Sequence, residues 1–319
     1  MMHRIVFLSA VALLIALSSA SALAAFPGAT GRIVFYDAFS LGLQTYPGCD
    51  SSACASEETG YALRTVRPDG TDGRSLGSCR SGRPCSDSGP TFSPDGRWLA
   101  FDVKGSSLMI SRADGSRRRV VPTPEAVDRV YQPAWSPDGR QLAFVAVRSE
   151  PDRERYDIFV ANTDGSDARP VTDGARDGAP AWSTKGLIAF ERSETESEKD
   201  FFAPDIHVVD PRTGDERRLT RRGGGANPSW APDGVRLAFT RGPYPGAASL
   251  HVLNTKTGRS RRIVRRAFDP GWSPDGRFIA YGCKQGLCKI SPRNRRERVL
   301  ARRRGSLHFG GVDWQPLRR

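Results

Sequence analysis

A short segment recurs along this chain, and each copy has an aromatic residue, a tight polar turn and an apolar run in the same order. Copies include PTFSPDGRWLAF at 90–101, PAWSPDGRQLAF at 133–144 and PGWSPDGRFIAY at 270–281. The aromatic residues recur at intervals of 42 to 48 residues and are Phe92, Trp135, Trp182, Trp230, Trp272 and Trp314. A repeat of that length, built from strand-sized units, is typical of β-propeller blades.

Each copy predicts antiparallel strands joined by tight turns. In Ser-Pro-Asp-Gly, Pro presets φ at the second turn position and Gly tolerates the exit geometry. A third apolar run follows, such as DIFVAN at 157–162 or SLHVLN at 249–254, and usually a second Gly-bearing turn and a fourth strand. The sequence therefore predicts an all-β fold, a six-bladed β-propeller of four-stranded antiparallel blades.

The sixth copy is divided between the two ends of the chain. VDWQP at 312–316 supplies its first half and GRIVFYD at 31–37 its second. We expect residues 311–315 to pair with residues 31–37 and close the ring, because closure removes free sheet edges. The aromatic residues then pack between neighbouring blades.

These motifs resemble the WD40-like repeats, also called PD40, of TolB-type six-bladed propellers and of the propeller of prolyl oligopeptidase-like peptidases. The resemblance rests on the W-S-P-D-G turns at 135–139 and 272–276 and on DIFVANTDGS at 157–166, and it covers roughly residues 30–316. The resemblance implies the propeller fold, and the likeness to TolB implies a function together with an envelope protein. The α/β domain that precedes the TolB propeller has no counterpart here, which weakens that second implication.

The first residues have the pattern of an export signal. Residues 1–4 are positively charged, residues 5–20 are apolar, and Ala22-Leu23-Ala24 is a small-residue cleavage site. This pattern predicts a secretory signal peptide at 1–24, with no transmembrane anchor left after cleavage, followed by a single propeller domain at 25–319. We expect a bacterial protein exported to the periplasm, the cell-wall space or the medium, and a monomer.

The cysteines favour an oxidising compartment. All six fall into close pairs, which are Cys49 with Cys54, Cys79 with Cys85, and Cys283 with Cys288. We expect three local disulfides, with exchange between the first two pairs left open. A zinc site is the competing interpretation, but these spacings without a histidine cluster match it poorly, so no metal site is predicted.

The candidate binding residues lie on one face of the predicted propeller. The connections between second and third strands share that face with the connections between blades, and long loops are expected there at 38–60, 149–155, 193–204 and 242–248. Long loops on a rigid scaffold commonly carry function. The candidate ligand-binding residues are Glu196, Glu198, Asp200, Phe201, Phe202 and Tyr244 in loops, with Gln132, Asn227 and Asp269 at the channel mouth.

Each of these candidates has a simpler explanation. The alternative for the acidic segment with its Phe pair is a solvated loop whose Phe side chains pack back onto the blade. The polar residues at the channel mouth, with which Asp313 is grouped by its place at a strand entry, bind either a polar group or ordered water. Both interpretations stay open at the level of sequence.

Charge is the other signal. The formal net charge is +13, and removal of Arg4 with the signal leaves +12 (13 − 1). Arginine pairs and triplets recur near the fourth strands, the outer edges of the blades. They either block edge-to-edge pairing or attract an anionic envelope polymer. Nucleic acid is disfavoured, because the arginines are spread out and not grouped with stacking aromatic residues.

Catalytic signals are weak. His207 and His251 occupy the position that Phe159 has in its blade, so we expect them to pack within their blades. We identify no catalytic residue and no cofactor. The sequence predicts an exported, non-catalytic binding or scaffold propeller that recognises a protein or an anionic envelope polymer through its long-loop face or its Arg-rich rim. The alternative is a propeller enzyme, a lyase or hydrolase acting on carbohydrate or peptide.

Overall fold

The computed structural model describes residues 29–45, 55–76, 87–103, 105–174, 176–193, 204–221, 224–243, 247–302 and 308–317. Within these residues the chain forms six four-stranded antiparallel sheets. The predicted signal peptide at 1–24 lies outside the described residues.

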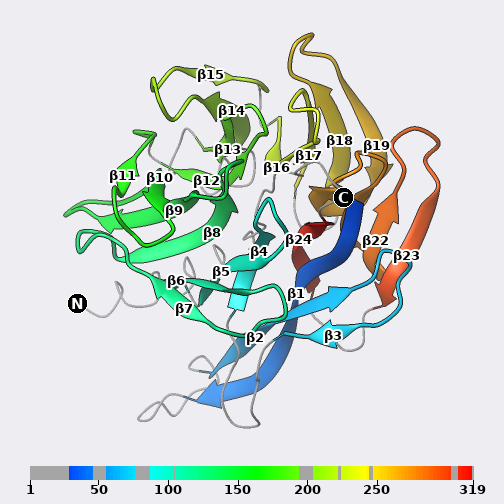
Figure 1. Ribbon diagram of the computed structural model, residues 1–319, viewed down its shortest axis with the longest axis horizontal. Helices are drawn as coiled ribbons and strands as arrows, with labels where there is room; N and C mark the ends of the chain where they lie inside the picture. Colours follow the sequence, from blue (N-terminus) through cyan, green and yellow to red (C-terminus); the bar gives the residue numbers. More distant parts are fainter. Residues whose placement is uncertain are drawn as a thin grey trace.

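Each sheet is one blade (Figure 1). From the innermost strand outward, the blades are β24 (His308–Leu317), β1 (Ala29–Thr45), β2 (Ala55–Val66), β3 (Arg74–Ser75); β4 (Asp87–Phe92), β5 (Trp98–Val103), β6 (Ser107–Arg112), β7 (Arg119–Val121); β8 (Arg129–Trp135), β9 (Gln141–Ser149), β10 (Glu154–Asn162), β11 (Arg169–Pro170); β12 (Asp177–Trp182), β13 (Ile188–Arg192), β14 (Asp205–Val209), β15 (Glu216–Arg218); β16 (Ala226–Trp230), β17 (Arg236–Arg241), β18 (Ser249–Asn254), β19 (Ser260–Arg265); β20 (Ala267–Trp272), β21 (Ile279–Cys283), β22 (Gly286–Ile290), β23 (Glu297–Arg302). The innermost strands β24, β4, β8, β12, β16 and β20 each contact the next around a closed ring. The predicted six-bladed propeller is confirmed.

The two ends of the chain close the ring as predicted. β24 pairs antiparallel with β1, with Trp314 opposite Ile33, and the ladder runs from Ala29 to Ala38 on β1. Gln315 joins this blade to the next one. Its Oε1 accepts the N–H of Arg32 at 3.2 Å, and its Nε2 donates to the carbonyl oxygen of Gly96 at 2.9 Å.

The Ser-Pro-Asp-Gly turns are held by their own side chains. Ser93 Oγ donates to Asp95 Oδ1 at 2.6 Å, and Asp95 Oδ1 also accepts the N–H of Arg97 at 3.0 Å. The N–H of Trp98 then donates to Ser93 Oγ at 3.0 Å. The turns at 136–141 and 273–278 repeat this arrangement. Side chains that bond to their own turn explain why this short sequence recurs.

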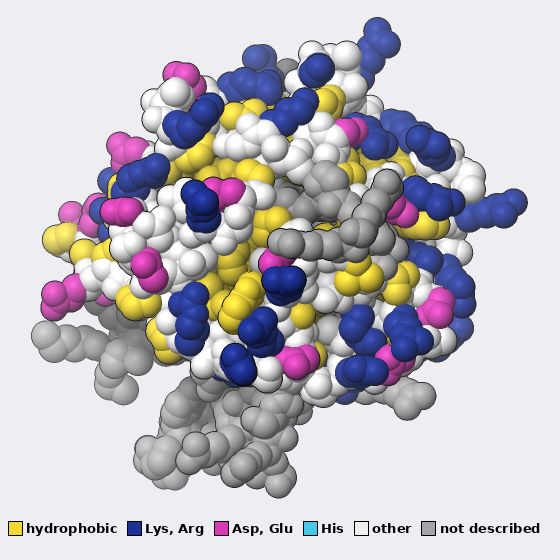
Figure 2. Space-filling model, in the orientation of Figure 1, with side chains coloured by type: hydrophobic (Ala, Val, Ile, Leu, Met, Phe, Trp, Pro, Cys, Tyr) yellow, Lys and Arg dark blue, Asp and Glu magenta, His cyan; other side chains and the backbone are white. Residues whose placement is uncertain are grey.

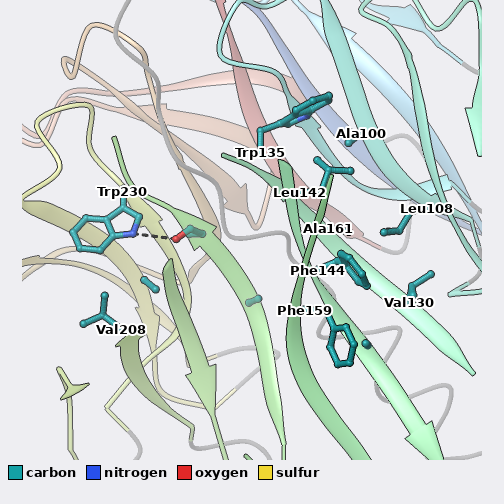
Figure 3. Packing of buried hydrophobic residues seen from close by; sticks show 14 of the residues in the cluster. Ala100, Leu108, Val130, Trp135, Leu142, Phe144, Phe159, Ala161, Val208 and Trp230 are labelled. Atoms are coloured by element: carbon teal, nitrogen blue, oxygen red, sulfur yellow. Dashed lines mark hydrogen bonds between the residues drawn. The ribbon is translucent and has the colours of Figure 1, made fainter. Parts of the chain in front are cut away.

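The repeated aromatic residues pack between blades, as predicted. The indole N–H of Trp135 donates to the carbonyl oxygen of Thr91 in the preceding blade at 3.1 Å. Figure 3 shows the equivalent bond from Trp230, whose acceptor is the carbonyl oxygen of Ala181 at 3.1 Å. Trp314 makes the same contact with Gly271 at 2.9 Å. These side chains are almost fully buried, so they are part of the core rather than a stacking surface for a ligand.

The expected long loop at 38–60 is mostly strand, and the one at 149–155 is shortened by strand pairing, which corrects the sequence-based prediction. β1 and β2 remain paired from Ala38 opposite Tyr61 to Thr45 opposite Ala55. β9 and β10 remain paired out to Ser149 opposite Glu154. Residues 39–45 alternate apolar and small or polar side chains, a pattern that lets the ladder continue. The β1–β2 hairpin reaches beyond the neighbouring blades (Figure 1).

One of the three expected disulfides lies within the described residues. It joins Cys283 and Cys288, whose Cα atoms are 5.9 Å apart, and it staples the β21–β22 hairpin. The other two expected pairs fall outside the described part of the chain, so their pairing stays a prediction; these cysteines are Cys49, Cys54, Cys79 and Cys85.

Basic side chains mark the outer edges of the blades. The outer strands carry exposed arginines, and all three residues of β15 are exposed. Figure 2 shows Lys and Arg side chains around the rim of one face. Among the described residues, no helix has the length and apolar character needed to span a bilayer.

Candidate functional site

The six innermost strands share one irregularity. Each has a residue with positive φ, between 49° and 58°: Gly89, Gln132, Ala179, Asn227, Asp269 and Gly311. We call these six residues the inner ring. The pairing with the second strand shifts register at each of them, which marks a β-bulge. Five are followed by proline, which has no N–H, so bulge and proline together prevent further strand pairing at the inner edge.

Hydrogen bonds link the inner ring from blade to blade. The N–H of Gln132 donates to Asp102 Oδ1 at 3.1 Å, and Gln132 Oε1 accepts the N–H of Ala179 at 2.9 Å. The N–H of Asn227 donates to Glu191 Oε2 at 2.9 Å. In each case the acceptor belongs to the preceding blade. A side-chain acceptor therefore replaces the strand hydrogen bond that each N–H loses at the bulge.

An acidic pair lies around Asn227. Its Nδ2 donates to Asp269 Oδ1 at 3.1 Å, while its N–H is bound by Glu191. Burial raises the pKa of Glu191 to about 7. Burial, and then the charge of Glu191, raise the pKa of Asp269 well above its usual range, although the N–H of Gly311 bonds to its carboxylate. The pair therefore holds protons more tightly than free carboxyls do.

Two further buried carboxyls continue the arrangement. Asp102 accepts the hydroxyl of Ser88 at 2.6 Å, and burial raises its pKa to about 6. Asp313 Oδ2 accepts the N–H of Phe92 in the next blade at 2.7 Å, and Asp313 Oδ1 accepts the N–H of Trp314 at 2.7 Å. Burial raises the pKa of Asp313 to about 7. Asp313 thus links the first blade to the β4–β7 blade, as the inner ring links other neighbouring blades.

The predicted site residues divide into two groups. Gln132, Asn227 and Asp269 all belong to the inner ring, where Asn227 and Asp269 touch and Gln132 lies in a separate link. Gln132 and Asp269 are buried and Asn227 is half-buried, so their role in binding stays a prediction. The loop residues Glu196, Glu198, Asp200, Phe201, Phe202 and Tyr244 lie outside the described residues.

Sequence reasoning missed two of the carboxyls. Asp102 and Glu191 follow the apolar run of the second strand, in LAFD and IAFE, where other copies have Val145 or Thr240. A carboxyl that follows a buried strand in only two copies is a departure from the repeat. That departure is the sequence signal that could have identified the two carboxyls, and it indicates a local polar contact rather than a feature of the shared fold.

The histidines and one serine have structural positions. His207 and His251 stack on Phe190 and Phe239, with ring centroids 5.6 and 5.5 Å apart, as Phe159 does on Phe144, so the predicted packing role is confirmed. GRSLG at 73–77 has the letters of a hydrolase nucleophile elbow, G-x-S-x-G. Its serine, Ser75, lies exposed on the outermost strand β3, opposite Arg64, whereas an elbow holds its serine on a strand-to-helix turn.

The acidic pair predicts a pH-dependent stability. A carboxyl whose pKa is higher in the folded chain than in the unfolded chain costs stability as pH rises from about 4 through its folded value. Glu191→Gln keeps an oxygen for the N–H of Asn227 and removes one charge. We expect urea denaturation to show the wild-type protein losing more stability than the variant between pH 5 and pH 8.

The control is Glu191→Ala, which leaves the N–H of Asn227 without its acceptor and should be less stable than wild type at pH 5. Parallel stability curves for wild type and Glu191→Gln would show that the carboxyl of Glu191 titrates normally.

Comparison with known proteins gives both sequence and fold matches. A sequence model of the family described as PD40: TolB beta propeller domain matches residues 51–290. "Uncharacterized peptidase YuxL" of Bacillus subtilis is 28% identical, over 47% of this chain and 29% of that protein. "Tol-Pal system protein TolB 1" of Novosphingobium aromaticivorans is 38% identical, over 24% of this chain and 16% of that protein. The chain therefore matches less than a third of the length of either relative.

Solved structures share the fold. TolB from Acinetobacter baumannii superposes with a TM-score of 0.64 at 18% identity, over 90% of this chain and 67% of that one. An oligogalacturonate lyase from Vibrio parahaemolyticus superposes with a TM-score of 0.54 at 12% identity, over 86% of both chains. At these identities the similarity shows the propeller architecture alone.

Proposed function

Because this chain belongs to the TolB beta propeller domain family, PD40, we propose that it is an exported, non-catalytic propeller that binds an envelope protein through its long-loop face. One relative is named as a Tol-Pal system protein, and that name supports a role within a protein assembly. The observation that carries the proposal is that the propeller combines a cross-linked centre with a hairpin that projects from that face. The inner ring ties the blades together, and the β1–β2 hairpin extends beyond them.

The polar groups of the inner ring support a scaffold role. Gln132 and Asp269 are directed to neighbouring blades and are buried. Side chains used in this way hold neighbouring blades together, and a binding surface presented by a preorganised scaffold loses less conformational entropy on binding. The loop residues Phe201, Phe202 and Tyr244 then serve as aromatic anchors, a residue class enriched in binding hot spots.

The test is capture of partners from the protein's own cell envelope, with washes at low and high salt. We expect one protein to be retained at high salt, and purified partner to bind the chain in a sensor assay. The double variant Phe201→Ala, Phe202→Ala should lose that binding. Val120→Ala is the matched control, because Val120 is 56% exposed on β7, the outermost strand of another blade.

Complete release by salt would contradict the proposal. It would indicate instead that the Arg-rich rim binds an anionic envelope polymer, since exposed charge interactions weaken as salt rises. If the double variant still binds the partner, Phe201 and Phe202 are not the anchors, and the contact lies elsewhere on the long-loop face.

An enzyme is the second candidate. The observation that favours it is the Glu191–Asp269 pair, because carboxyls with raised pKa values concentrate at active sites. The lyase with the same fold and the relative named as a peptidase give the substrate classes to assay, oligogalacturonate and peptides. Turnover that is lost in Glu191→Gln would support the enzyme, and no turnover of either class would remove it.

A further inference from the structure

We propose that a basic pocket on the β16–β19 blade binds a phosphate-class oxyanion. The pocket has a volume of about 410 Å³ and is lined by Ala247, Ser249, Arg262, Arg265 and Arg266. It lies where the connection between β17 and β18 meets the connection to the next blade, since the N–H of Ala267 donates to the carbonyl oxygen of Ala248 at 3.2 Å. This inference does not depend on the protein partner proposed above.

The same cationic positions exist in the preceding blade. By strand register, Arg192 on β13 corresponds to Arg241 on β17, because they lie opposite Asp205 and Ser249 respectively. Arg218 on β15 corresponds to Arg262 on β19, because they lie opposite His207 and His251. The two blades therefore share a pair of arginines beside a histidine.

In the β12–β15 blade these arginines are neutralised. Arg192 makes a two-point ion pair with Asp177 at 2.6 and 2.8 Å. It also bonds to Glu216 at 2.6 Å, and Glu216 Oε1 lies 2.9 Å from His207 Nδ1. Arg218 forms an ion pair with Asp205. Three carboxylates thus surround two guanidinium groups.

All three carboxylates are absent from the equivalent places in the β16–β19 blade. Asp205 is replaced by Ser249, and Glu216, opposite Val209, is replaced by Ser260, opposite Leu253. Asp177 is replaced by Gly225, the residue before β16. The arginines are retained while their counterions are lost. Within the described part of the chain, Arg241, Arg262, Arg265 and Arg266 form no ion pair.

Backbone irregularities add two more cations. A β-bulge shifts the β18–β19 register between Leu250 and His251, so that Arg262 lies opposite His251 and Arg265 lies opposite Ser249. Residues three apart on a regular strand face opposite sides, and the bulge places these two on the same side. Arg266 follows with a φ of 54°, a conformation uncommon for a side chain of this size. The backbone is therefore shaped to gather arginines at one place.

The pKa of a histidine beside the pocket responds to these arginine charges. His251 Nε2 lies 3.0 Å from Ser249 Oγ, and Ser249 Oγ also donates to the carbonyl oxygen of Arg241 at 3.2 Å. Burial, followed by the charges of Arg241 and Arg262, lowers the pKa of His251 to about 4. A bound anion would offset those charges and raise this pKa.

The chemistry favours a multiply charged tetrahedral oxyanion. A single carboxylate neutralises one charge, whereas a phosphate or diphosphate group neutralises two or more and offers oxygens to several guanidinium forks. Because three carboxylates are missing from this blade, diphosphate matches the deficit better than monophosphate. We therefore expect pyrophosphate to bind more tightly than inorganic phosphate.

The test is isothermal titration calorimetry of the full chain with pyrophosphate and with inorganic phosphate, at constant ionic strength. We expect one saturable site and a loss of affinity of roughly tenfold or more in Arg262→Gln, Arg265→Gln. Ser249→Asp restores the aspartate of the preceding blade and should weaken binding similarly. Arg259→Gln is the matched control, an exposed arginine in the turn before β19, and its affinity should be unchanged.

A second readout locates the anion. In an NMR titration, saturating pyrophosphate should raise the pKa of His251, and Arg262→Gln should raise it without any ligand. An unchanged pKa would place the anion elsewhere and overturn the proposal. So would the absence of saturable binding, or an equal loss of affinity in Arg259→Gln, which would indicate diffuse surface charge.

The source of the phosphate is separable by experiment. Phosphatidylcholine vesicles with and without phosphatidic acid are sedimented with the full chain. Sedimentation that needs phosphatidic acid and is reversed by pyrophosphate identifies a lipid headgroup as the ligand. Pyrophosphate binding without sedimentation identifies a soluble phosphate compound. Both outcomes use the same pocket and support the proposal.

Discussion

A chain that ends at residue 307 should fail to form a cooperatively folded propeller. The deletion removes β24, which supplies the innermost strand of the first blade and the fully buried side chains of Val312 and Trp314. Loss of one buried Trp side chain alone costs about 3–5 kcal/mol, and a typical domain has only about 5–15 kcal/mol of stability in total. Removing the whole strand also exposes the inner edge of β1. We expect urea denaturation, followed by circular dichroism, to lose its sigmoidal transition.

The matched control ends at residue 317. It keeps all of β24, whose last residue Leu317 is 42% exposed, and it should unfold like the full chain. Addition of a peptide with the sequence of residues 308–317 should restore part of the transition to the shortened chain. A wild-type midpoint in the shortened chain would mean that the first blade is stable with three strands and that ring closure contributes little.

Asp313→Ala should destabilise the protein by about 2–5 kcal/mol at pH 5.5. The substitution leaves the buried N–H groups of Phe92 and Trp314 without their acceptors, one on each side of the junction between the first blade and the β4–β7 blade. Asp313→Asn keeps one acceptor oxygen and should lose less. Asp152→Ala, at an exposed position in the turn between β9 and β10, should change stability by less than about 0.5 kcal/mol.

The same substitution has a pH dependence with a defined sign. Burial raises the pKa of Asp313 to about 7, so the wild-type protein loses stability as pH rises from about 4 through 7, while the Ala variant has no such group. The stability difference between them should therefore narrow from pH 5.5 to pH 8. A difference that stays constant from pH 5.5 to pH 8 would instead show that the two N–H donors stabilise the charged carboxylate and that the pKa of Asp313 is not raised.

The fold was predictable because its determinants repeat. The Ser-Pro-Asp-Gly turns and the buried aromatic residues occur in several copies, and each copy independently predicts the same strand pair. The divided copy at the two ends predicted closure, and the pairing of Ile33 with Trp314 confirms it. Local sequence preference and the global architecture agree at these positions, which is the condition under which pattern reasoning succeeds.

The site was less predictable because it depends on departures from the repeat. Gln132, Asn227 and Asp269 were identified, but their positive φ was not, since a residue before proline ordinarily adopts an extended conformation. Asp102 and Glu191 bind N–H groups of the next blade, a contact that no spacing along the chain indicates. The missing counterion at Ser249 became visible only when strand register aligned it with Asp205.

The division of one blade between the two ends of the chain has a consequence for the order of folding. Arg32 and Gln315 touch although 283 residues separate them, so the contact that shuts the ring spans nearly the whole polypeptide. During synthesis or export from the N-terminus, β1 emerges early and its partner emerges last. Blades formed from contiguous residues can assemble as they are synthesised, whereas the inner edge of β1 in the first blade stays unpaired until β24 is available. During that interval the unpaired edge of β1 is open to pairing with another chain, and a chaperone would be most useful then.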